Sequence, residues 1–271
     1  MKRILASLVL VTTVAACAAD CQPDLNGRQD WYRCEWLTNL ELQIPAGAVG
    51  IDIRNSSIAT IPSDAFTRYA NTLEELNITG SGVEEIQPHA FRGLGKLRVL
   101  GLVDNKIRAL DTSWLRDLPQ LSALVVWSNR IATIDTRLYD LLPNLEFWDI
   151  AHNELVDCPT AESLKKLARL RRIYIAGNPW SYRCRSSMTW YLGSNHIRFL
   201  QDWGATDLVV EECLAHAPGA ATDDVALNNC VERKTVSADM MSHVNTSIQY
   251  LVKKVMQLEA DVTALKKAGG Y

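Results

Sequence analysis

The sequence predicts an α/β solenoid with disulfide-bonded caps at both ends and a C-terminal coiled-coil helix. Three observations support this fold class: apolar residues recur every 24 or 25 positions through the middle of the chain, cysteines flank that region on both sides, and a heptad pattern follows it. The composition is that of a globular protein, since 48% of the 271 residues are hydrophobic and 22% are charged. A formal net charge of -3 argues against a nucleic-acid partner, because phosphate binding requires a basic face.

The repeat is visible when five leucines are aligned, namely Leu73, Leu97, Leu121, Leu145 and Leu170. Apolar residues recur three, five and ten positions after each leucine, and a polar residue recurs eight positions after it. These polar residues are Ser81, Asn105, Asn129, Asn153 and Asn178. The pattern, L-x-x-L-x-L-x-x-N-x-L, is the leucine-rich repeat. With a degenerate copy ahead of Leu73, it predicts a horseshoe of about five to six coils over residues 48–180.

Each position of the repeat has a physical role. The L-x-L segment forms a short strand whose alternate residues point into the coil, and parallel strands stack about 4.8 Å apart to form a concave wall. The asparagine amide suits a position that faces inward, because it can satisfy backbone groups that the turn leaves unpaired. A single coil cannot bury its own apolar face, so stacking supplies the stability and the ends require caps.

The remaining strand positions predict the side chains that line the concave surface. They are polar in the first coils and apolar or aromatic in the later ones, where they form one contiguous patch. The predicted binding residues are Val99, Val103, Val125, Trp127, Phe147, Asp149 and Tyr174. An exposed apolar patch with aromatic anchors is typical of an interaction site. The alternative is that the chain's own cap or tail covers the patch.

The N-terminal residues 1–18 are typical of a secretory signal peptide, with basic Lys2 and Arg3, an apolar run over residues 4–16 and small residues around a cleavage site. The segment Val14-Ala15-Ala16-Cys17 also resembles a bacterial lipoprotein box, in which Cys17 would be acylated. Both interpretations place the protein outside the cytosol, and we expect a secreted, extracellular protein. No second apolar stretch reaches the length of a membrane span.

Removal of the signal peptide leaves six of the seven cysteines, which is an even number suited to disulfides. We expect Cys21–Cys34 in an N-terminal cap over residues 19–47. Cys158 and Cys184 occupy nearly equivalent positions in successive coils, so we expect them to pair as well. Cys213–Cys230 follows by elimination within a helical C-terminal cap, residues 181–235. Zinc is the rival for these cysteines, but no CxxC pair or suitably spaced histidine is present, and we expect no metal.

Residues 236–268 carry a heptad pattern with β-branched residues favoured at a and leucine at d, which favours a parallel two-stranded coiled coil. Its core residues are Met241, Val244, Ile248, Leu251, Val255, Leu258, Val262 and Leu265. The tail therefore predicts a homodimer or a heterodimer. The alternative is an amphipathic helix that folds back on its own cap.

Two further patterns concern modification and catalysis. Sequons at Asn55, Asn77 and Asn245 are candidates for N-glycosylation. No nucleophile, metal-protease or phosphate-loop motif is present, and His152 beside Asp149 is the only histidine placed on the concave face. We therefore expect that the protein is not an enzyme and that it has neither catalytic residues nor a cofactor.

The order of these parts resembles the secreted leucine-rich repeat immune proteins of mosquitoes. It comprises a signal peptide, a cysteine-bearing start, the repeats, Asn178-Pro179-Trp180 with Cys184, a cysteine pair and a coiled coil. The resemblance implies a non-enzymatic binding or scaffold protein of innate immunity. It also implies a protein partner, either a complement-like thioester protein or a pathogen surface.

This sequence departs from that group in lacking adjacent cysteines before the coil and in having a short coil, so it looks like a short member. The six paired cysteines leave no thiol to link two chains, so dimerisation would depend on the heptads. The alternatives are an extracellular adhesion or matrix leucine-rich repeat protein, and an inhibitor or regulator of a secreted enzyme.

Overall fold

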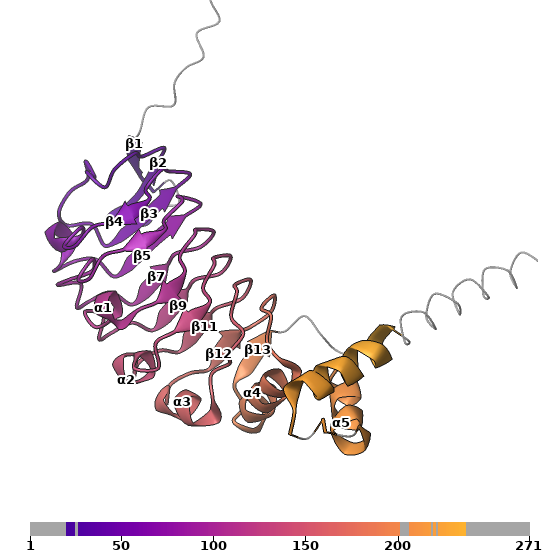
Figure 1. Ribbon diagram of the computed structural model, residues 1–271. Helices are drawn as coiled ribbons and strands as arrows, with labels where there is room; N and C mark the ends of the chain where they lie inside the picture. The colour runs from indigo at the N-terminus through magenta and orange to yellow at the C-terminus, as the bar shows by residue number, and fades with distance from the viewer. Residues whose placement is uncertain (1–19, 25–26, 201–205, 218, 221, 237–271) are drawn as a thin grey trace, which may run out of the picture. The chain divides into compact units, whose positions relative to one another are not determined.

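The computed structural model describes residues 20–24, 27–200, 206–217, 219–220 and 222–236 (Figure 1). The chain forms two compact units. The repeat unit runs to Leu155 and includes Glu162–Asn178, and the C-terminal unit contains Val156–Ala161 and the chain from Pro179 onward. The predicted signal peptide, the heptads of the predicted coiled coil and the Asn245 sequon lie outside the described residues.

A sheet forms one wall of the repeat unit, and its strands follow one another in chain order (Figure 1). These strands are β1 (Asp20–Pro23), β2 (Trp31–Glu35), β3 (Gly50–Arg54), β5 (Glu75–Thr79), β7 (Val99–Gly101), β9 (Ala123–Val125), β11 (Phe147–Asp149) and β12 (Arg172–Tyr174). β1 pairs with β2 antiparallel, and every later pair is parallel and in register. The strands fall on the L-x-L segments, as the repeat predicts.

The rest of each coil returns along the opposite side of the unit through short elements. Two small parallel pairs are β4 (Thr60–Ile61) with β6 (Glu85–Ile86), and β8 (Ala109–Leu110) with β10 (Thr133–Ile134). The short helices are η1 (Thr67–Tyr69), α1 (Thr112–Leu115), α2 (Leu138–Leu141) and α3 (Ala161–Lys166). The coils are nearly equal in length, but their returns use different short elements, so the repeat is conspicuous on its strand side and weak elsewhere.

The core lies between the sheet and these returns. The aligned leucines from Leu73 to Leu145 are fully buried, and Leu170 is 6% exposed. Aromatic rings join the returns of neighbouring coils: Phe66 stacks on Phe91, with ring centroids 5.9 Å apart, and Phe91 meets Trp114 edge to face at 5.7 Å. Such contacts hold successive coils together, because each ring packs against the coil before or after it.

The asparagines of the repeat link consecutive coils, as the sequence predicts. The Oδ1 atom of Asn129 accepts a hydrogen bond from the backbone N–H of Ile107, at 3.1 Å. Its Nδ2 donates to the carbonyl oxygens of Leu102 and Val126, at 2.7 and 3.1 Å. Asn105, Asn153 and Asn178 make corresponding bonds. Each amide thus satisfies buried backbone groups that belong to two coils.

One residue of each coil, directly before this polar position, has a left-handed backbone that sequence reasoning missed. The residues are Asn55, Gly80, Asp104, Ser128, His152 and Gly177, with φ between 47° and 65°. All except histidine are small or turn-forming, and glycine, asparagine and aspartate tolerate this conformation best. From Asn55 to His152, the backbone N–H of each of these residues donates to the next coil, as Asp104 does to the carbonyl of Trp127 at 3.0 Å. These residues form one edge of the concave face.

The N-terminal cap continues the sheet, since β2 pairs in parallel with β3. The disulfide Cys21–Cys34 joins β1 to β2, and Cys34 is fully buried. Trp31 lies against Gly50, where any Cβ would overlap the indole ring, and the Arg28 guanidinium lies over the ring at 3.4 Å from its centroid. The cap is therefore one more layer of the same solenoid.

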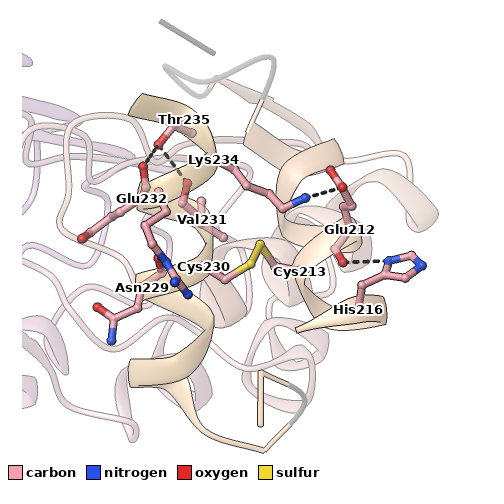
Figure 2. Close-up of a disulfide and its surroundings, with 10 residues drawn as sticks. Glu212, Cys213, His216, Asn229, Cys230, Val231, Glu232, Lys234 and Thr235 are labelled. Carbon is pink, nitrogen blue, oxygen red and sulfur yellow. Dashed lines mark hydrogen bonds and ion pairs between the residues drawn. A yellow bond between two sulfur atoms is a disulfide. The ribbon is translucent and has the colours of Figure 1, made fainter. Parts of the chain in front are cut away.

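The C-terminal unit is mainly helical. It contains α4 (Tyr182–Ser194), β13 (Arg198–Leu200), α5 (Thr206–His216) and a helix over residues 224–236. The disulfide Cys213–Cys230 joins α5 to this last helix and lies in a small core (Figure 2). The other buried members of that core are Val210, Ala220, Leu227 and Val231.

The disulfide Cys158–Cys184 forms as expected, but its geometry differs from the one inferred from the repeat. Cys184 lies in the first turn of α4 and not in a further coil. Ser181 caps this helix, because its Oγ accepts a hydrogen bond from the Cys184 N–H at 3.3 Å. Serine at that position ends the repeat register and starts a helix, which accounts for the difference.

Candidate ligand-binding surface on the concave sheet

The in-register sheet arranges the concave side chains in rows that cross the strands. One row runs Glu75, Val99, Ala123, Phe147 and Arg172. The next runs Asp52, Asn77, Gly101, Val125, Asp149 and Tyr174. The register places Val99, Val125 and Phe147 on adjoining rows. Val103 and Trp127 lie two residues beyond the second row, at equivalent points of neighbouring coils.

Aromatic side chains contact one another across the last coils of this face. Phe147 meets Tyr174 edge to face, with ring centroids 5.2 Å apart, and the Arg172 guanidinium lies 5.7 Å from the Phe147 centroid. Trp127 meets the His152 ring edge to face at 5.5 Å. Trp127 nevertheless stays 39% exposed, and Phe147 and Tyr174 are half-buried. The result is a largely apolar surface with one exposed and two half-buried aromatic side chains on the sheet. We call Val99, Val103, Val125, Trp127, Phe147 and Tyr174 the aromatic patch.

Asp149 lies inside this patch and is less exposed than the repeat pattern implies. The pattern makes it a solvent-facing strand residue, but only 8% of its surface is exposed, because bulky neighbours surround it. Its Oδ1 accepts a hydrogen bond from the backbone N–H of Ala151 at 3.1 Å. Burial raises the pKa of the Asp149 carboxyl, and the Ala151 N–H and nearby His152 only partly oppose that shift.

The first coils of the same face are polar. Asp52 is 5% exposed and pairs with two guanidinium groups, from Arg54 at 2.8 Å and Arg33 at 3.4 Å. Asn77 donates to Glu75 at 2.8 Å and lies against Gly101, where a Cβ would approach its Oδ1 to 2.2 Å. The polar groups of this half are therefore largely satisfied by one another.

The two described sequons differ in their surroundings. Asn55 is exposed, and its left-handed backbone places it at the edge of the concave face. Asn77 is half-buried on β5, with its amide nitrogen bonded to Glu75. The sequence alone does not separate these sites, because both match the same three-residue motif.

Metal-binding clusters and membrane-spanning helices are both absent from the described residues. In the part of the chain that the structure describes, no group of three or more histidine, cysteine or acidic side chains is placed to hold a metal ion. No helix among the described residues is both long and apolar enough to span a membrane.

The stacked parallel coils and their asparagine links define a leucine-rich repeat solenoid. The family described as "Leucine rich repeat" matches residues 50–107, 71–131 and 96–155, so this part of the chain consists of leucine-rich repeats. Among solved structures, the chain is similar to one titled "Crystal structure of TLR13-ssRNA13 complex", with a TM-score of 0.52 and 24% identity. The match covers 59% of this chain and 23% of that chain, and it concerns the fold. No significant match to a curated protein is found.

Proposed function

We propose that the chain is a secreted, non-enzymatic binding protein of innate immunity that holds a protein partner on the aromatic patch. The observation that carries this proposal is the exposure of aromatic side chains on the in-register concave sheet. Trp127 is 39% exposed although it contacts His152, and Phe147 and Tyr174 meet edge to face on the following strands. Tryptophan and tyrosine are enriched among the residues that contribute most to protein interfaces.

The extracellular and immune parts of the proposal rest on different grounds. Three disulfides fit an oxidising, extracellular environment. The resemblance to secreted mosquito immune proteins suggests a complement-like thioester protein or a pathogen surface as the partner. The similar structure is titled as a complex with ssRNA13. The concave face here carries acids and bases together, with Asp52 paired to Arg33 and Arg54, and it is not the basic face that binding to nucleic-acid phosphates requires.

Affinity capture from extracellular fluid tests the proposal. The secreted full chain should retain a thioester protein or a pathogen-surface component, and Trp127→Ala with Phe147→Ala should abolish that retention. Trp190→Ala is the matched control, because Trp190 is 73% exposed but lies on α4, outside the patch. Matrix components or a single enzyme in the eluate would instead support the adhesion or enzyme-regulator alternatives. Equal retention by the patch variant would contradict the proposed surface.

We also expect an N-linked glycan on Asn55 and none on Asn77 of the secreted chain. The Asn55 side chain is exposed, whereas a glycan on Asn77 would have to replace an amide hydrogen in a crowded position between Glu75 and Gly101. Glycopeptide mass spectrometry measures the occupancy of both sites, and Asn55→Gln should remove the modified peptide while Asn77→Gln should not. Full occupancy of Asn77 would contradict this expectation.

A further inference from the structure

Two buried acids, Asp52 and Asp149, occupy the same row of the concave sheet, and the side chains around them differ. The register runs from Asp52 through Asn77, Gly101 and Val125 to Asp149. Asp52 is 5% exposed and Asp149 is 8% exposed. A buried carboxylate requires a charged or hydrogen-bonding partner, because removal from water disfavours its ionised form.

Asp52 obtains that partner from within the chain. The guanidinium of Arg54 approaches it at 2.8 Å, and that of Arg33 approaches it at 3.4 Å. The pair of arginines neutralises the carboxylate and supplies donors to both of its oxygens. Asp52 therefore shows what a buried acid on this face requires.

Asp149 has no equivalent partner among the described residues. Its Oδ1 accepts the Ala151 N–H, its Oδ2 receives no hydrogen bond in the described part of the chain, and no lysine or arginine there pairs with it. Arg172 is on the neighbouring strand, but its guanidinium is directed to the Phe147 ring. The Asp149 carboxylate is thus poorly solvated and incompletely bonded.

The side chains around Asp149 are suited to a cation. Tyr174 is its register neighbour on β12, and Phe147 is on its own strand. Phe147 already contacts one guanidinium, which shows that an arginine fits against the aromatic rings of this surface. The combination of aromatic faces and a desolvated carboxylate matches the planar guanidinium, which donates to carboxylates and stacks on rings.

We propose that Asp149 receives a basic side chain of the protein partner, an arginine in preference to a lysine, and that this contact selects the partner within the aromatic patch. The inference rests on the proposed function, since it assumes that a protein segment binds the patch. It adds the chemical type of the partner residue that contacts Asp149. Asp52 is excluded as a second such site because the chain's own arginines already occupy it.

Peptides displayed on phage and selected against the secreted full chain test this inference. We expect the selected peptides to share a basic residue. Binding of the best synthetic peptide should weaken about tenfold with Asp149→Asn, which keeps an acceptor for the Ala151 N–H but removes the charge. A peptide with citrulline in place of its arginine should lose a similar factor against the wild type and lose little further against Asp149→Asn.

Controls separate this inference from the proposed function. Asp52→Asn removes one charge from the same row and should leave peptide binding unchanged. Peptides without a basic residue, or equal binding to wild type and Asp149→Asn, would overturn the inference; continued dependence on Phe147 would then leave the proposed function standing. If Phe147→Ala weakened neither the binding of the captured partner nor that of the peptide, the inference and the proposed function would both be contradicted.

A measurement on the free protein provides a second readout. Asp149→Asn should raise the thermal midpoint, because it removes an unpaired carboxylate from a buried site. Asp52→Asn should lower the midpoint, because it deprives Arg33 and Arg54 of their shared partner. A decrease with Asp149→Asn as large as that with Asp52→Asn would show that Asp149 is already paired and would overturn the inference.

Discussion

Replacing Asn129 by alanine should lower the free energy of unfolding of the repeat unit by about 3–5 kcal/mol. The variant leaves the Ile107 N–H and the Leu102 carbonyl without their side-chain partner, whereas the Val126 carbonyl keeps its hydrogen bond from Asn153. Each buried backbone group left without a partner costs about 1–3 kcal/mol. Water cannot easily replace the amide, since the residue is 9% exposed. The shift of the urea midpoint at unchanged slope measures the loss.

Two further variants show whether the inward position is what matters. Asn144→Ala is the matched control, because Asn144 also bridges coils by donating to the Pro119 carbonyl at 2.9 Å, but on an exposed surface. We expect that variant to change stability by less than about 1 kcal/mol. Asn129→Ser should be intermediate, since Ser81 fills the same repeat position and bonds the Thr79 carbonyl at 3.0 Å. Equal losses for Asn129→Ala and Asn144→Ala would disprove the role of the inward asparagines.

Removing the disulfide Cys213–Cys230 should unfold the C-terminal unit around α5 and the helix over residues 224–236. The bond closes a loop with a sequence separation of 17, so its loss in the double alanine variant costs about 3 kcal/mol by chain entropy. The small core of Val210, Ala220, Leu227 and Val231 offers little else. The ion pair between Lys234 and Glu212 on the surface adds only a modest contribution (Figure 2).

Limited proteolysis reports this change directly. The double variant should be cleaved rapidly within residues 206–236, while the repeat unit stays resistant. The matched control removes Cys21–Cys34, with a separation of 13, where β2 remains paired with β1 and β3. That control should lose stability without becoming sensitive in the C-terminal unit. Unchanged cleavage of the Cys213–Cys230 variant would show that its helices are held together by other contacts.

The solenoid is well predicted from the sequence, because each coil buries the same positions and these positions recur at a constant interval. Leucines at 24- and 25-residue intervals and inward asparagines leave few alternatives, and the strands form where the L-x-L segments lie. The disulfide Cys158–Cys184 was expected for a reason that the structure changes. A serine that begins a helix, such as Ser181, looks like any other serine until the register ends.

The candidate site was predicted as a set of concave positions, but its chemistry was not. The burial of Asp149 depends on the bulk of neighbours from other coils, and a repeat alignment records only that the position is a strand residue. The left-handed edge was missed because its members, such as Asp104, Ser128 and His152, share a backbone conformation and not a side-chain type. A search for turn-forming residues at one repeat position would have found most of them.

The affinity of the captured partner for three forms of the secreted chain tests the central claim most directly. The forms are the wild type, Phe147→Ala and Trp190→Ala, each measured by titration at the same salt concentration. If the partner binds the aromatic patch, Phe147→Ala should raise Kd by at least about tenfold, and Trp190→Ala should leave Kd unchanged. A Kd that rises with Trp190→Ala and not with Phe147→Ala would place binding outside the concave sheet and contradict the proposal.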